Sequence, residues 1–108
     1  MHLVRLRQHL QALHDVLARS GETLAARQVL HALSQADPQL EIFLLSNDLW
    51  GGSGSIADQA GCGLARASRR SIESALIDLG EAQLGAGLAN IRTKGWVEAF
   101  RSSQNQGI

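Results

Sequence analysis

Five leucines near the start of the chain recur at the period of an α-helix. They are separated by 3, 4, 3 and 4 residues, and polar side chains fill much of the sequence between them: Leu3, Leu6, Leu10, Leu13 and Leu17. This spacing puts all five leucines on one face of a helix. The stripe predicts a helix over about residues 2–20 that must bury one side against other elements.

The second segment continues the helical pattern after a short break. Ser20 and Gly21 end the first helix, because glycine adopts the left-handed conformation of a helix C-cap, and Glu22 begins the second helix. Its predicted buried face is Ala26, Val29, Leu30 and Leu33. A connection this short predicts that the two helices pack as an antiparallel hairpin.

Asp37 and Pro38 predict the start of a third helix over about residues 38–49. The aspartate can cap free N–H groups, and proline fits the first helical position, where its missing donor is not needed. Apolar residues cover more than one face of this segment, so we expect it to be central and contacted on several sides: Leu40, Ile42, Phe43, Leu44, Leu45, Leu49 and Trp50.

The second half of the chain predicts a short helix and two longer ones. Ser55 and Asp58 have the spacing of a capping box, which predicts a helix over 56–60. From about residue 66 a long helix carries two apolar stripes, with Leu84, Leu88 and Ile91 on the second, and we expect a bend near Gly80 to reconcile them. A last helix ends near Arg101, and the polar residues 102–108 are expected to fray.

These elements predict an all-α fold. We expect residues 1–108 to form one domain, a compact bundle of about five helices with a glycine-rich corner between the third helix and the short one. The 108 residues carry 10 basic and 10 acidic side chains, so no net field attracts nucleic acid or a membrane. A single cysteine, no signal-peptide pattern and no membrane-spanning stretch favour a cytoplasmic protein.

The glycine-rich corner lies within the sequence LWGGSGSIADQAG at residues 49–61. Gly52, Gly54 and Ala57 match the G-x-G-x-x-A pattern of dinucleotide-binding folds, but that mechanism needs a βαβ unit, and no second strand is visible. No lysine follows the glycines, so a phosphate-binding P-loop is excluded. We therefore expect no cofactor at the corner.

A helix-turn-helix is the alternative interpretation of residues 55–80. In that motif the second helix enters the major groove of DNA, and Arg66, Arg69 and Arg70 would contact it here. The connection between the two predicted helices is longer than the motif's usual turn. Arg92 and Lys94 would lie at the tip of a wing, although the residues after them lack strand alternation.

The corner resembles a motif in small uncharacterised bacterial proteins, where an aromatic residue is followed by Gly-Gly-x-Gly-Ser. The matching residues here are Leu49, Trp50, Gly51, Gly52, Gly54, Ser55, Ile56 and Asp58. Ser53 stands where the motif usually has methionine. The resemblance implies an all-helical fold and implies no reaction.

No catalytic or metal-binding constellation is visible. His9 and His14 are five residues apart and His2 and His9 are seven apart, so neither pair shares one helical turn, and we expect surface histidines, His31 included. Cys62 has no visible base and is expected to be an inert thiol. Asp78 and Glu81 are expected on a solvated face. The chain is therefore not predicted to be an enzyme.

The distribution of charge gives the corner a second interpretation. Between Gln28 and Ala65 there is no lysine or arginine, while Asp37, Glu41, Asp48 and Asp58 lie there. An acidic segment flanked by basic ends favours a basic partner or a homodimer. We therefore predict a bacterial protein-interaction module of the immunity or accessory type, with an aromatic anchor and a contact surface made of Trp50, Gly51, Gly52, Ser53, Gly54, Ser55 and Asp58.

Overall fold

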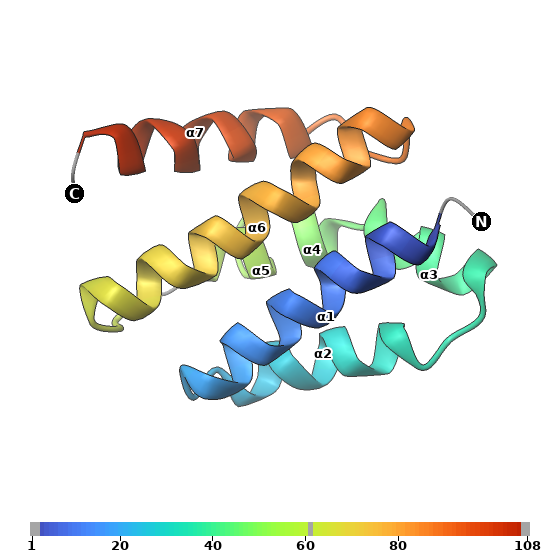
Figure 1. The fold of residues 1–108 in the computed structure, drawn as a ribbon, viewed down its shortest axis with the longest axis horizontal. Coiled ribbons are helices and arrows are strands. Elements are labelled where there is room, and N and C mark those ends of the chain that lie inside the picture. Colours follow the sequence, from blue (N-terminus) through green and yellow to red (C-terminus); the bar gives the residue numbers. More distant parts are fainter. Residues whose placement is uncertain (1–2, 61, 107–108) are drawn as a thin grey trace.

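The computed structural model describes residues 3–60 and 62–106, and every regular element in this part of the chain is an α-helix. The helices are α1 (Leu3–Arg19), α2 (Thr23–Leu33), α3 (Asp37–Leu44), α4 (Asn47–Trp50), α5 (Ile56–Gln59), α6 (Arg66–Ala86) and α7 (Thr93–Asn105) (Figure 1). Five of them have eight residues or more. The predicted all-α fold with about five main helices is confirmed.

Two long helices, α1 and α6, lie side by side at the centre of the molecule. In Figure 1 α2 flanks α1 and α7 flanks α6, while the short helices α4 and α5 lie behind this pair. The chain reverses direction between α1 and α2, as the short connection predicts, and again between α6 and α7. None of the helices in the described residues has the length and apolar character that crossing a membrane requires.

The leucine stripe of α1 is the central part of the hydrophobic core. All five leucines are at most 2% exposed, as their spacing predicts. On α2 one assignment was wrong, because Leu30 is 51% exposed and Ala32 is buried in its place. Leu30 follows the fully buried Val29 by one residue, which turns its side chain about 100° around the helix axis, away from α1.

The predicted third helix is divided in two. The chain turns at Leu45 and Ser46, where the Ser46 hydroxyl donates to the Phe43 carbonyl at 2.7 Å, and α4 begins at Asn47. Ile42 is 68% exposed and Leu45 is 40% exposed, so the prediction that this segment is contacted on several sides was wrong. Only one face of the segment enters the core, through Leu40, Leu44, Leu49 and Trp50.

Asp37 holds α1 to the start of α3 instead of capping that helix. Ala36 occupies the N-cap position and Asp37 is the first helical residue. Its carboxylate accepts a hydrogen bond from Arg7 at 2.8 Å, and the same guanidinium donates to the carbonyls of Leu33 and Gln35. The predicted capping role was wrong, and the residue serves an ion pair between distant segments.

Helix α6 is one continuous helix through Gly80, where a bend was expected, and Gly87, whose φ of 72° is left-handed, is its C-cap. The second apolar stripe, which also includes Ile77, is buried only in part: Ile77 lies in the core and Leu88 packs against it, whereas Leu84 is 39% exposed and Ile91 is 97% exposed. The C-terminal prediction also needs correction. Residues 102–105 belong to α7 and do not fray, because Gln104 binds the Arg70 carbonyl and the Ser74 hydroxyl of α6; residues 107–108 lie outside the described part.

Gly80→Ala should destabilise the protein, whereas Gly85→Ala should not. A Cβ at Gly80 would lie 2.4 Å from Val97 Cγ2 and 3.2 Å from the Trp50 ring. Overpacking of this kind costs about 1–3 kcal/mol, which exceeds the gain of about 1 kcal/mol in helix propensity. A Cβ at Gly85, in the same helix, meets nothing within 4 Å, so that variant should gain stability. Urea unfolding of both variants tests this, and equal shifts in their midpoints would contradict it.

Candidate functional site

Trp50, the predicted anchor of a contact surface, belongs to the core. Its side chain is 0% exposed, and its indole Nε1 donates to Gln83 Oε1 at 2.8 Å. The Gln83 amide nitrogen donates in turn to the carbonyls of Leu44 and Leu88 at 2.9 and 2.8 Å. The prediction that Trp50 contacts a partner was wrong, because no partner can reach a buried ring.

Gly51 is required by the close approach of its own helix. A Cβ at this position would lie 2.1 Å from the Asn47 carbonyl oxygen, which no side chain tolerates. The Gly51 carbonyl accepts hydrogen bonds from Trp96 Nε1 at 3.0 Å and from the Ser55 hydroxyl at 3.2 Å. Gly51 therefore joins α4 to both α5 and α7.

The rest of the corner is held together by hydrogen bonds among its own residues. The Ser55 hydroxyl accepts from the Asp58 amide at 3.0 Å, which confirms the predicted cap of α5. The Asp58 carboxylate accepts from the Gly54 amide at 3.0 Å, and Gly54 has a left-handed φ of 88° that favours glycine. Gly52 and Ser53 are exposed. The corner is thus a closed hydrogen-bonded turn, and its exposed part is a small polar tip.

Asn90 is a corner residue that the sequence analysis missed. Its side-chain amide lies 3.2–3.3 Å from the carbonyls of Leu45, Ser46 and Trp50, and its side-chain oxygen accepts from the Thr93 amide at 3.1 Å. These bonds fasten the α6–α7 turn over the end of α4. Asparagine between two apolar residues in a turn gave no sequence signal for such long-range contacts.

The three predicted DNA-binding arginines lie together at the start of α6. Arg66 is exposed, and Arg69 and Arg70 are half-buried. Arg70 and Arg19 line the same surface pocket beside α1, which adds a fourth cation to this end of the molecule. The predicted wing is absent, because Arg92 immediately precedes α7 and Lys94 lies within it.

Reactive side chains do not gather in the described residues. No group of three or more histidine, cysteine, aspartate or glutamate side chains in this part of the chain has the arrangement of a metal site. Cys62 is exposed. His14 lies 3.0 Å from Asp15, and its hydrogen bond, followed by that of Gln11, lowers the pKa of the Asp15 carboxyl. His2 lies outside the described residues.

Exposed apolar side chains gather at the end of the molecule that carries the α6–α7 turn. Leu45 is the C-cap of α3, three residues after Ile42, and the side-chain amide of Asn90, the residue before Ile91, donates to the Leu45 carbonyl at 3.2 Å. The three side chains are 68%, 40% and 97% exposed. We call Ile42, Leu45 and Ile91 the apolar end. No family model, curated protein or solved structure matches the chain.

Gln83→Leu should destabilise the fold strongly. The variant keeps the size of the side chain but leaves the Trp50 N–H and the carbonyls of Leu44 and Leu88 without their buried partner. Because each buried unsatisfied group costs about 1–3 kcal/mol, we expect a loss of about 3 kcal/mol or more in the free energy of unfolding. Gln39→Leu, on the exposed surface of α3, is the matched control and should change stability little. A loss at Gln83 no larger than that of the control would contradict the role of this amide.

Proposed function

We propose that this chain is a non-enzymatic protein-interaction module whose contact surface is the apolar end. The exposure of Ile42, Leu45 and Ile91 is the observation that supports it. Side chains of this size seldom gather on a surface without a partner, and apolar surface removed from water drives association. The buried Trp50 is replaced in this role by isoleucine and leucine.

The exposed Asp48, three residues after Leu45, favours a partner with a basic side chain on that side of the apolar end. Lysine or arginine at the rim of a partner's apolar surface would find opposite charge there, which speeds and orients association. The proposed partner therefore presents an apolar centre with a basic rim. A chain that recognises one such target would act as an immunity or accessory protein.

Ile42→Asp and Ile91→Asp should each abolish capture of the partner without unfolding the protein. Both positions are exposed, so a carboxylate there opposes association but leaves the core intact. Tagged protein is used to capture partners from lysate of the native host, and stoichiometric species are identified and quantified by mass spectrometry. Leu24→Asp is the control, because Leu24 is 74% exposed on α2, outside the apolar end.

The informative result is a species retained by the unmodified chain and by Leu24→Asp but lost from both isoleucine variants. A partner that binds all four proteins equally would place the contact elsewhere and refute the proposal. Far-ultraviolet circular dichroism of each variant shows that loss of capture does not arise from unfolding.

Nucleic-acid binding is a second candidate, favoured by the arginines at the start of α6. Arg66, Arg69 and Arg70 lie within two helical turns, and Arg19 adds to them from the end of α1. Such a cluster suits phosphate contacts. Helix α5 has four residues, which is shorter than the first helix of a helix-turn-helix, so contacts to the phosphate backbone are favoured over reading of bases.

Under this second candidate, affinity for a DNA duplex falls steeply as salt increases. Arg69→Ala should reduce the slope of log affinity against log salt by about 1, since one phosphate contact is lost. Lys94→Ala, on α7, is the control and should leave the slope unchanged. Absence of duplex binding at about 50 mM salt, where release of counterions favours association, would eliminate this candidate.

A further inference from the structure

A continuous groove runs between α1 and α6. Three surface hollows join along it, because Asp78 lines the first and second, and Val16, Arg19 and Ser71 line the second and third. The α1 side follows one helical face through Arg5, His9, Ala12, Val16 and Arg19. Since residues 5 to 19 rise about 1.5 Å each, the groove is roughly 20 Å long.

Within residues 3–60 and 62–106, no helix other than α1 and α6 lines this groove. In Figure 1 α1 and α6 lie at the front of the molecule, and α2 and α7 flank their outer sides. Small side chains line much of the groove, which lets another helix approach closely: Ala12, Ala67, Ser71, Ser74, Ala75, Ala82, Gly85 and Ala86. The groove therefore has the length and the small lining side chains that suit packing against helices of another chain.

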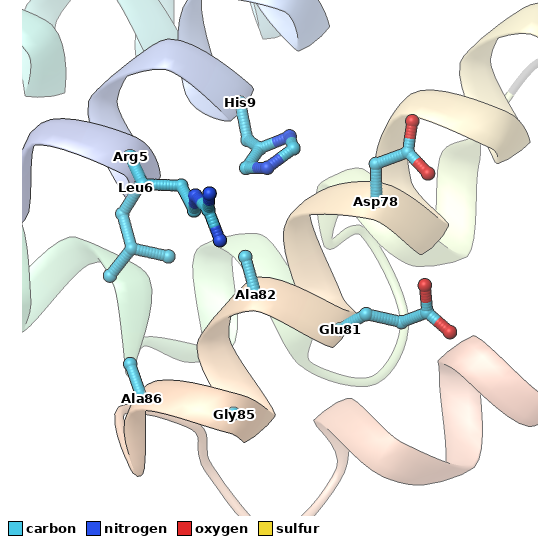
Figure 2. Close-up of a pocket in the computed structure, with 8 residues that line it drawn as sticks. All are labelled: Arg5, Leu6, His9, Asp78, Glu81, Ala82, Gly85 and Ala86. Atoms are coloured by element: carbon cyan, nitrogen blue, oxygen red, sulfur yellow. The ribbon is translucent and has the colours of Figure 1, made fainter.

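Three of the side chains that border the groove are basic on one side and acidic on the other: Arg5 and His9 on α1, and Asp78 on α6. Figure 2 shows Arg5 and His9 projecting from α1 into the gap, while the Asp78 carboxylate stands on the α6 side. Among the described residues none of these three side chains has a hydrogen bond or an ion pair. Glu81 differs, because it pairs with Arg101 of α7. Thus one side of the groove is basic and the facing side keeps a free acid.

We propose that this groove is the interface of a homodimer, in which α1 of each chain packs against α6 of the other. A two-fold axis that runs parallel to the groove places α1 of each chain opposite α6 of the other. The rotation leaves the position of every residue along the groove unchanged. Asp78 lies level with the stretch from His9 to Ala12, since it borders the hollows that contain both residues. His9 then faces Asp78 of the partner subunit, and Arg5 lies one helical turn away from His9 on the same face of α1. The two-fold axis makes this contact occur twice.

The other arrangements of two chains are less favourable. An in-plane axis perpendicular to the groove, through the level of Asp78, would bring that carboxylate onto the same carboxylate of the second chain. The parallel axis has one unfavourable contact. Arg19 and Arg70 border the same hollow, so Arg19 of each chain would face Arg70 of the other. A crossing angle of about 20°, usual in helical bundles, separates the helices at that end.

The size of the face predicts a weak dimer. Two helices, each about 10 Å wide, along a groove of roughly 20 Å give roughly 400 Å² per chain. Stable complexes bury roughly 800 Å² per partner, so we expect dissociation in the micromolar range or above. The inference does not rest on the apolar end, which shares no residue with the groove.

Sedimentation equilibrium of the purified chain over about 1–500 μM tests the proposal. The unmodified chain should pass from monomer to dimer over this range. Asp78→Arg brings like charges together at both copies of the contact, and so does the double variant Arg5→Glu with His9→Glu. Each should weaken dimerisation at least about tenfold, which corresponds to about 1.4 kcal/mol.

A mixture of the two variants provides the decisive measurement. In a mixed dimer arginine at position 78 faces the two glutamates, and the unchanged Arg5 and His9 face the unchanged Asp78, so a 1:1 mixture should regain the affinity of the unmodified chain. Glu98→Arg, on the exposed surface of α7, is the control for a reversed charge and should dimerise normally.

Three results would overturn the proposal. A chain that stays monomeric at 500 μM would show that a second copy does not fill the groove, and a helix of another protein would become the candidate occupant. A dimer unaffected by Asp78→Arg would place the interface elsewhere, and a mixture that fails to recover would exclude this axis. Ile42→Asp should dimerise like the unmodified chain, so failure of the dimer and failure of the partner contact at the apolar end are separate outcomes.

Discussion

A single buried amide, that of Gln83, joins elements that the rest of the structure depends on. It accepts from the indole of Trp50 at the end of α4, and it donates to the carbonyl of Leu44 at the end of α3 and to that of Leu88 beyond α6. Inside a protein such bonds are stronger than in water, and leaving one unmade is correspondingly expensive. The amide therefore holds the ends of α3 and α4 against α6 and the turn that follows it.

Local sequence signals predicted the parts of the fold that depend on neighbouring residues. The leucine stripe of α1, the serine cap of α5 and the short hairpin between α1 and α2 follow from spacing and side-chain chemistry within a few residues. Gln83 and Asn90 could not be found in this way. Apart from neighbours such as Leu88 and Thr93, their partners lie 33 to 45 residues away, and a polar residue with distant partners has no periodic signature.

The contact surface was predicted around Trp50, and the assignment of that aromatic residue to the surface was wrong, because its ring is buried. A tryptophan before glycines is compatible with an exposed anchor and with a buried ring under a tight turn, and only the position of α6 decides between them. Gly80 leaves space for that ring. Since Trp50 fills the core, the exposed apolar surface falls instead on Ile42, Leu45 and Ile91, which the sequence pattern had assigned to helix faces in the interior.

The two proposed surfaces are compatible with each other in one assembly. A two-fold axis parallel to the α1–α6 groove keeps each residue at its level along that groove. The apolar end adjoins the end of the groove that contains Arg5 and Ala86, because Ile91 follows α6 by a short turn. Both apolar ends of a dimer then lie at the same end of the assembly. A partner with two binding sites would engage both at once, and the second contact would form at the high effective concentration that the first provides. Weak dimerisation would thus strengthen partner binding without any additional contact in either chain.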